Sequence, residues 1–358
     1  MAYGNNTYVN DFRKIEQDLK TGGIDASGPI LLCGSEGFLI EHYEKKLTNY
    51  FLDTIFPDLN LNIFYGDEAS DDDIMGTCDT LPMVGEYRVV VSRDNLGLSS
   101  ASSAKTSASS KQQLLEKYVS QSPESTALIF TSHNLNKKSK LYTALKTDGK
   151  IYELNRLSED DLILFVKKRF KKSKLNVNEK VLSSFIFLSS YLEKDSDKDL
   201  FSLTGEITKI CTFVSSEGRT EVTFEDLSEC MESNLQSDVF TMLDAISTNR
   251  KAEAIRQLET TLAQGSNIFQ LTALFTGHFE IMLGYKEMSA KDYPKSKMMN
   301  IMNVKSDYRL KKLGQFSDRF TIKDLMKILH RFYSIERDIK SGNISENLAL
   351  TILLSDIG

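Results

Sequence analysis

Through residue 155 the chain alternates short, continuous apolar runs with longer stretches whose apolar positions recur every three or four residues. Runs that are apolar throughout predict strands covered on both faces, and the stretches between them predict helices. This pattern is typical of a parallel α/β domain of the nucleotide-binding kind. The five expected strands are 30–33, 60–65, 88–92, 127–131 and 150–154.

After Asn155 the apolar positions keep helical spacing, and no further strand is expected. The first helices, near 160–172, 181–192 and 199–214 with a short one at 224–231, form a three-helix unit that looks like a lid. The remaining helices are expected at 239–247, 251–264, 267–286, 307–313, 322–341 and 345–354. The pattern predicts a multidomain α/β plus all-α protein with domains at 1–154, 155–232 and 233–358.

Composition is consistent with several domains and excludes other classes of protein. The chain has 358 residues, which is more than a single hydrophobic core usually contains. Its hydrophobic content of 41% is too high for a disordered chain. No apolar run approaches the ~20 residues of a membrane span. The net charge of −6 argues against a protein that coats nucleic acid by bulk charge.

Cysteine and histidine usage points to neither a disulfide scaffold nor a metal site. The four cysteines form no CxxC pair, and the four histidines are equally scattered. We expect no metal and no cofactor, and a reducing cytoplasm as the location.

The turn after the first strand resembles a phosphate loop that has lost its functional residues. A phosphate loop needs the pattern GxxxxGK[ST], in which a lysine neutralises the phosphates and a hydroxyl holds Mg²⁺. Counting from Gly34, the second glycine is replaced by Leu39, the lysine by Ile40 and the hydroxyl by Glu41. An apolar side chain cannot bind a phosphate and a carboxylate would repel one, so nucleotide hydrolysis is not expected here. We expect no catalytic residue elsewhere either: Asp94 is interpreted as a loop acid and His133 as a strand-end polar group.

Between the second and third strands, residues 81–84 read Leu81-Pro82-Met83-Val84, and we call them the tip. The proline restricts the residue before it and Gly85 frees the chain after it, which predicts a turn. Apolar side chains at such a turn either fold back as a plug or are presented to a partner. The residues alone favour the plug and leave presentation to a partner open.

Two lysine-rich clusters are candidates for contact with a nucleic-acid backbone. A solvated helix end is the simpler explanation of the stronger cluster, because cations favour a helix C-terminus. The stronger cluster consists of Lys167, Lys168, Arg169, Lys171, Lys172 and Lys174, and the weaker one of Lys137, Lys138 and Lys140.

Together these motifs resemble the delta subunit of the bacterial DNA polymerase III clamp loader over essentially the whole chain. Residues 31–41 look like the degenerate phosphate loop of that family, and the tip stands where the family has its clamp-binding residues. Residues 199–203 with Glu206 and Lys209 are similar to its lid helix. The motifs similar to its helical collar are Val239-Phe240, Leu243-Asp244-Ala245-Ile246, Lys340-Ser341-Gly342 and Leu348-Ala349-Leu350.

The resemblance implies an AAA+-like fold without ATPase activity, followed by a helical lid and a collar that assembles with other subunits. It implies a replication protein that binds and opens the ring-shaped sliding clamp, with Met83 and Val84 as the inserted pair and Leu81 beside them. Val84 departs from the bulkier residue common in the family. Phe201 stands where an active relative has a lid arginine.

The implied partners are the sliding clamp, the ATPase and delta-prime type subunits of the loader, and primed DNA bound by the complex, with no membrane. A label of DNA-directed DNA polymerase, a nucleotidyltransferase, would describe the assembled holoenzyme. The alternatives are an active AAA+ ATPase or helicase, and a DNA-binding replication accessory protein.

Overall fold

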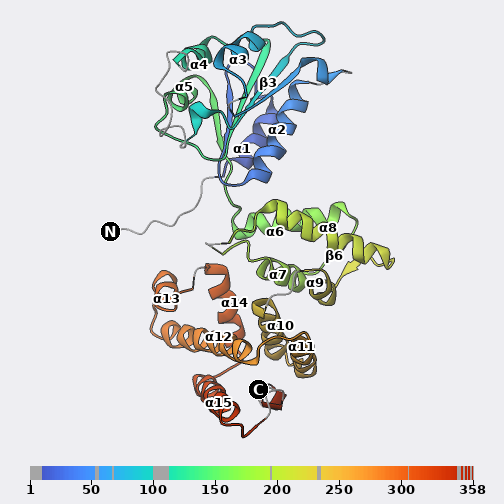
Figure 1. Ribbon diagram of the computed structural model, residues 1–358, viewed down its shortest axis with the longest axis vertical. Coiled ribbons are helices and arrows are strands. Elements are labelled where there is room, and N and C mark those ends of the chain that lie inside the picture. The colour runs from blue at the N-terminus through green and yellow to red at the C-terminus, as the bar shows by residue number, and fades with distance from the viewer. Residues whose placement is uncertain are drawn as a thin grey trace. The chain divides into compact units, whose positions relative to one another are not determined.

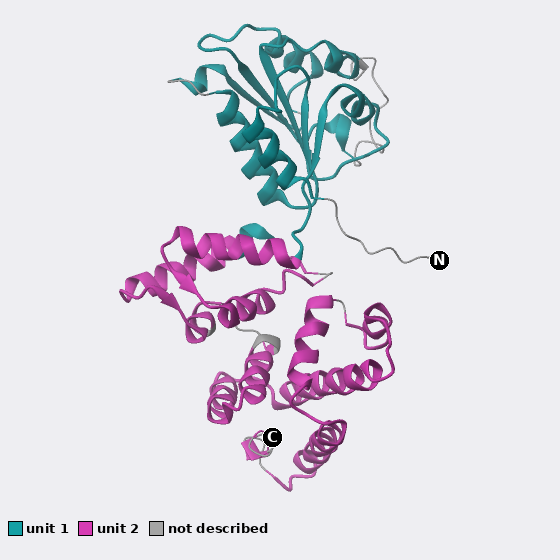
Figure 2. Ribbon diagram, turned by 180° about the vertical axis from the view of Figure 1, so that it is seen from behind, with its two compact units in different colours: residues 1–158, 199–203 teal, residues 159–198, 204–358 magenta. Residues whose placement is uncertain are grey.

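The computed structural model describes residues 10–52, 56–66, 68–99, 113–193, 196–231, 235–304 and 306–344, with positions 348, 349, 351, 352, 354 and 357 near the end. Its internal contacts divide the chain into two units, residues 1–158 with 199–203 and residues 159–198 with 204–358 (Figure 2). The three-domain division stays a prediction. Leu350 of the collar motif, and positions 345–347 and 353 of the helix expected there, lie outside the described residues.

The five strands expected from the apolar runs are present and form one parallel sheet in the first unit (Figure 1). They are β1 (Ile30–Cys33), β2 (Leu61–Tyr65), β3 (Arg88–Arg93), β4 (Thr126–Ser132) and β5 (Lys150–Glu153). The strand order is β2-β3-β4-β1-β5. Every residue of β1 and β4 is buried, whereas β2 at the sheet edge is only half-buried. The predicted fold class, an α/β sheet domain followed by helical structure, is confirmed.

Helices cover both faces of this sheet (Figure 1). One face carries α1 (Phe12–Thr21) and α2 (Gly37–Phe51), and the other carries α3 (Asp71–Cys78), α4 (Gln113–Tyr118) and α5 (Lys140–Asp148). Short 3₁₀ turns, η1 (Pro57–Asn60), η2 (Leu96–Leu98) and η4 (Val119–Gln121), link the elements. The helix α1 was not expected from the sequence, although its apolar residues Phe12, Ile15 and Leu19 follow helical spacing; Ile15 is its one buried residue.

The second unit consists mainly of helices (Figure 1). In chain order they are α6 (Glu159–Lys172), α7 (Glu179–Leu188), α8 (Leu200–Ser216), α9 (Phe224–Cys230), α10 (Leu235–Ser247), α11 (Lys251–Ala263), α12 (Ile268–Ser289), α13 (Lys295–Ile301), α14 (Asp307–Ser317) and α15 (Ile322–Lys340). The first residues of α8, up to Leu203, are counted with the first unit. No helix in the described ranges has both the length and the apolar composition needed to cross a membrane.

The expectation that strands end after Asn155 is wrong. The strands β6 (Asn176–Val177) and β7 (Glu221–Val222) pair in parallel in the second unit. Each has two residues, which is too short to produce an alternating pattern in the sequence. Their pairing depends on the packing of the helices that bring two distant segments together.

The core of the second unit's C-terminal half is built from aromatic side chains on several helices. The rings of Phe275 and Phe279 on α12 lie 5.9 and 5.6 Å from the ring of Phe332 on α15, measured between centroids. All three are fully buried, and the helical spacing of Phe275 and Phe279 in the sequence agrees with their burial.

A buried histidine on α12 is fixed in its neutral form by two neighbours. His278 Nδ1 lies 2.7 Å from Leu274 O, and Nε2 lies 3.2 Å from Arg309 Nη2. Because a carbonyl only accepts and a guanidinium only donates, Nδ1 carries the proton and Nε2 accepts. Burial, with the neighbouring Arg309 cation, lowers the pKa of His278 to about 4. Arg309 in turn pairs with Glu193 at 3.1 Å.

Lowering the pH from 7 to 5 is therefore expected to destabilise the protein by about 2 kcal/mol through this histidine. In the unfolded chain the imidazole takes up a proton near its ordinary pKa of 6.5, whereas the folded imidazole stays neutral down to about pH 4. Stability consequently falls as the pH falls between these two values. Urea unfolding followed by circular dichroism at both pH values measures the effect. His278→Gln cannot titrate and should lose this part of the pH dependence, so equal pH dependence in both proteins would contradict the assignment.

Candidate functional site

The turn between β1 and α2, where the sequence has its degenerate phosphate loop, is closed by hydrogen bonds within the first unit. The backbone amides of Gly34, Ser35 and Glu36 all donate to protein oxygens. Their acceptors are Ser132 O at 3.2 Å, Asn155 Oδ1 at 3.1 Å and Leu154 O at 3.1 Å, respectively. In a phosphate loop, backbone amides of the turn cradle the phosphate. In this chain they already have protein acceptors.

The three positions that depart from the phosphate-loop pattern have structural roles or face solvent. Leu39 and Ile40 on α2 are buried in the core of the first unit, and Glu41 is exposed. Gly34 has a φ of +145°, and a Cβ atom there would lie 2.0 Å from Leu154 O. The glycine is therefore required by the close approach of the segment that follows β5.

The strand ends beside this turn hold one polar pair. His133 Nδ1 lies 2.9 Å from Asp94 Oδ1, which also accepts the His133 backbone N–H at 3.0 Å. Asp94 follows β3 and His133 follows β4, so the pair links the ends of two adjacent strands. This contact is consistent with the interpretation of Asp94 as a loop acid and of His133 as a strand-end polar group.

The first residues of α8 lie against the start of α2. The amide of Leu200 donates to Glu36 Oε1 at 3.1 Å, and the Phe201 ring meets the Phe38 ring edge-on, with 5.2 Å between centroids. Phe201, which stands at the lid-arginine position in the resemblance, thus makes an apolar contact at this place. Glu36 is buried, and its carboxylate lies near the helix N-terminus, where a negative charge is favoured.

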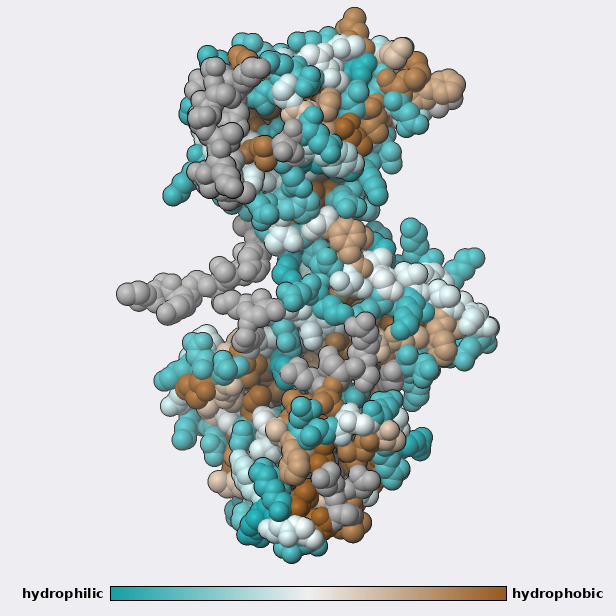
Figure 3. Space-filling model, in the orientation of Figure 1, coloured by the Kyte–Doolittle hydropathy of each residue, from teal (hydrophilic) through white to brown (hydrophobic). Residues whose placement is uncertain are grey.

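The tip is exposed, which corrects the favoured expectation of a plug. Leu81 is 74% exposed, Met83 71% and Val84 38%. Hydrophobic residues stand out among hydrophilic ones at the upper end of the first unit (Figure 3). The sequence could not separate the two possibilities, because the same apolar residues suit either one, and only the path of the backbone decides. Leu81 and Met83 are more exposed than Val84, so the exposed set contains the Met83–Val84 pair that the resemblance implies and adds Leu81 to it.

Buried polar side chains hold the backbone of the tip. Asn60, at the end of η1, accepts the Met83 N–H at its Oδ1 (2.7 Å) and donates from Nδ2 to Val84 O. Arg88, the first residue of β3, donates to Thr80 O at 2.9 Å and to Leu81 O at 3.2 Å. Gly85 completes the turn with a φ of +80°. The tip is therefore held at both of its ends, by Arg88 of β3 at one and by Asn60 of η1 at the other.

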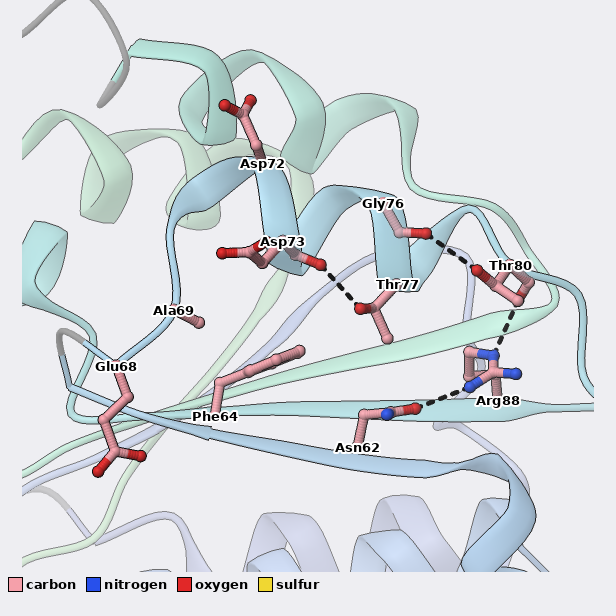
Figure 4. Close-up of a pocket in the computed structure, with 10 residues that line it drawn as sticks. All are labelled: Asn62, Phe64, Glu68, Ala69, Asp72, Asp73, Gly76, Thr77, Thr80 and Arg88. Atoms are coloured by element: carbon pink, nitrogen blue, oxygen red, sulfur yellow. Dashed lines mark hydrogen bonds between the residues drawn. The ribbon is translucent and has the colours of Figure 1, made fainter.

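An open groove of about 650 Å³ lies beside the tip, between β2 and α3 (Figure 4). Asn62 and Phe64 of β2 line one side, and residues of α3 line the other. Arg88 and Thr80 lie at one end, joined by the hydrogen bond drawn in Figure 4. Three carboxylates are also among its lining residues, those of Glu68, Asp72 and Asp73.

The weaker lysine cluster is partly neutralised. Lys137 pairs with Glu153 at 2.5 Å, whereas Lys138 and Lys140 are exposed. These residues belong to the first unit and the stronger cluster to the second, so the two are separate candidates.

The stronger cluster places five exposed lysines at and just after the end of α6. Of these, Lys167 alone approaches a carboxylate within the described part of the chain, with Nζ 3.9 Å from Glu179. Arg169 differs from the lysines: it stacks over the Phe165 ring at 5.0 Å, and burial lowers its pKa. The five lysines are Lys167, Lys168, Lys171, Lys172 and Lys174.

The sequence did not indicate that Asn60 and Arg88 hold the backbone of the tip. An arginine at the start of the all-apolar stretch Val89–Val91 is a usable signal, because a buried charged side chain requires hydrogen-bond partners. Asn60 gives no such signal, since an asparagine before a strand suits an ordinary turn.

Two family models match the chain. The model described as DNA polymerase III, delta subunit, matches residues 30–155, and the one described as DNA polymerase III delta subunit, C-terminal domain, matches residues 236–357. A curated protein, DNA polymerase III subunit delta of Bacillus subtilis (strain 168), is 21% identical over 325 residues. That match covers 90% of this chain and 90% of the curated protein.

Solved structures with similar folds include the Bacillus subtilis DNA clamp loader delta protein. It is 20% identical, with a TM-score of 0.46 over 96% of this chain and 98% of that one. The RuvB Holliday junction branch migration motor of Thermotoga maritima is 12% identical, with a TM-score of 0.42 over 66% of this chain and 76% of that one. A DNA polymerase III gamma subunit-related protein of Thermotoga maritima has a TM-score of 0.36 at 12% identity, over 95% of this chain and 97% of that one.

Proposed function

This chain belongs to the DNA polymerase III delta subunit family of clamp-loader proteins in DNA replication, and we propose that it binds and opens the sliding clamp through its tip. The observation that carries the proposal is the exposure of Leu81 and Met83 on a backbone held by buried side chains. Apolar side chains presented in this way suit insertion into a hydrophobic pocket of a partner. Met83 adapts its shape readily, which favours such insertion.

We further propose that the chain hydrolyses no ATP. The engaged amides of Gly34, Ser35 and Glu36 support this, as does the core position of Ile40, where a phosphate loop has its lysine. Energy for loading would then come from the ATPase subunits of the same complex. In this proposal residues 155–232 act as the lid and residues 233–358 as the collar that contacts the ATPase and delta-prime type subunits, in the cytoplasm.

A titration of the purified chain with the organism's sliding clamp tests the proposal. We expect a complex to form without nucleotide and no phosphate release when ATP is added. Failure to bind the clamp, both alone and with ATP-bound partner subunits, would contradict clamp binding. ATP turnover that is lost when the Gly34 turn is altered would favour the active-ATPase alternative.

A contact with primed DNA is the second proposal, and the exposed lysines at the end of α6 favour it. Lys168, Lys171 and Lys172 lie on the face of α6 opposite its buried residues Leu162, Val166 and Phe170. Lysines that are free of carboxylate partners can replace the counterions of a phosphate backbone. The contact would be local, which is compatible with the net charge of −6.

Replacing Lys168, Lys171 and Lys172 together by alanine is expected to weaken DNA binding and its salt dependence. The affinity falls with salt, and each lost phosphate contact reduces the steepness of log K against log salt by about 0.9, so the loss of three contacts would reduce it by roughly 3. Fluorescence anisotropy with primed DNA at several salt concentrations measures the slope. The matched control replaces Lys291, Lys295 and Lys297, which are exposed in the same unit. An equal loss in both triple variants would show a general charge effect and contradict the assignment.

A further inference from the structure

Asn60 holds the tip with both polar atoms of its side chain. It is fully buried, yet both bonds go to backbone atoms of residues whose side chains are exposed, Met83 and Val84. A buried amide normally satisfies its hydrogen bonds within the core. Here the carboxamide bridges the end of η1 and the tip, 23 and 24 residues further along the chain.

Arg88 holds the other end of the tip. Its guanidinium is buried and donates to three neutral oxygens, those of Thr80, Leu81 and the Asn62 side chain at 2.7 Å. The acceptors that the guanidinium contacts in the described part of the chain are therefore uncharged. A buried charge without an opposite charge is costly, and an apolar residue would suit the start of a buried strand better. The benefit lies in the fork geometry, which fixes two successive carbonyls of one loop.

We propose that Asn60 and Arg88 are positioning residues that hold the tip in its clamp-binding conformation before the clamp arrives. This inference rests on the proposed function. Their four bonds to the tip and its N-terminal neighbour fix backbone atoms at Thr80, Leu81, Met83 and Val84. Neither side chain needs to touch the clamp.

The physical advantage is entropic. A loop that is already ordered loses less conformational freedom when its apolar side chains enter a partner's pocket. Val84 is a small side chain and only partly exposed, so it offers little apolar surface for burial. A backbone fixed in advance compensates for this in part, because more of the contact energy appears as affinity.

The test compares Asn60→Ala with Asn95→Ala in the full chain. Asn95 is a matched control because it is also buried in the first unit and its amide also holds a loop, through the Gly97 N–H at 2.9 Å and Ser92 Oγ at 3.1 Å. We expect Asn60→Ala to bind the purified sliding clamp about tenfold more weakly, as expected from freeing the backbone of one residue. Asn95→Ala should bind as the wild type does. Equal clamp affinity of the two variants would overturn the inference.

A double-mutant cycle with Met83→Ala separates positioning from general stability. If Asn60 acts through the tip, Asn60→Ala should weaken clamp binding far less in the Met83→Ala background than in the wild type. Additive effects would contradict positioning. Should Asn60→Ala fail to fold, Arg88→Lys replaces it, since lysine keeps the charge but cannot bond both carbonyls in the same geometry.

Amide hydrogen exchange decides the inference independently of the clamp. The Met83 amide should exchange at least about tenfold faster in Asn60→Ala, while the amides of β3 and β4 should be unchanged relative to Asn95→Ala. Unchanged exchange at Met83 would overturn the inference. If clamp binding instead survives loss of the Met83 and Val84 side chains, the proposed function fails, and accelerated exchange would still support positioning of the tip.

Discussion

Replacing Met83 and Val84 together by alanine is expected to weaken binding of the sliding clamp by about 100-fold, or roughly 3 kcal/mol. Both side chains project from a turn, and Met83 is largely exposed, so truncation removes apolar contact surface without opening a cavity in the core. The backbone bonds from Asn60 to the tip do not involve the truncated side chains and should persist. A pulldown or titration with the clamp measures the loss, and circular dichroism checks the fold.

Leu114→Ala is the matched control for this variant. Leu114 is also an exposed apolar side chain of the first unit, on α4. It should leave clamp binding unchanged. Undiminished clamp binding by the Met83 and Val84 variant, with the fold intact, would remove the tip from the binding site. Because Leu81 is more exposed than Val84, Leu81→Ala is expected to cost more affinity than Val84→Ala.

Gly34→Ala is expected to destabilise the protein by about 3 kcal/mol or more in the absence of any nucleotide. Its φ of +145° is a conformation that residues with a Cβ rarely adopt, and the new Cβ would lie 2.0 Å from Leu154 O. That oxygen also accepts the Glu36 N–H, so a shift of the carbonyl would disturb the closed turn. Because the chain has no tryptophan, urea unfolding is best followed by far-ultraviolet circular dichroism.

Gly76→Ala provides the contrast within the same unit. A Cβ at Gly76 would have no neighbour within 4 Å, and the residue lies in helix α3, so alanine there should be neutral or stabilising by up to about 1 kcal/mol. Equal stability of Gly34→Ala and wild type would contradict a structural role for Gly34. The structural role itself explains how a glycine can stand at the start of a phosphate-like turn without phosphate binding.

The buried elements of this protein were the most predictable from its sequence. The strand β4, for example, lies within one residue at each end of the run expected at 127–131, because a strand covered on both faces needs apolar side chains at every position. Leu271, Phe275, Phe279 and Met282 on α12 are buried as their helical spacing predicts. The start of α3 at Asp71 agrees with the acidic residues there, and Asp73 forms a capping box with the N-cap residue Ser70.

Elements with few buried residues were not predictable in the same way. The strands β6 and β7 have two residues each and produce no periodic pattern. The helix α1 keeps helical spacing at Phe12, Ile15 and Leu19 but buries Ile15 alone, so its apolar pattern is carried by only three residues. Their formation depends on partners far away in the sequence. β6 pairs with β7 across more than 40 residues, and the Asp11 backbone at the start of α1 donates to Glu153 O at 2.8 Å.

The sequence by itself determined the succession of the five strands of the main sheet and of most helices, the loss of the phosphate-loop residues at Leu39, Ile40 and Glu41, and the apolar character of the tip. These properties depend on which residues occur and at what spacing. Only the tertiary structure decided that the Gly34 amide is already engaged and that Leu81 and Met83 face solvent. The reason is that both outcomes depend on single contacts between distant segments, from Ser132 to the turn and from Asn60 and Arg88 to the tip. Local patterns of hydrophobicity carry no information about such pairs, whereas burial of the strands that position them is encoded residue by residue.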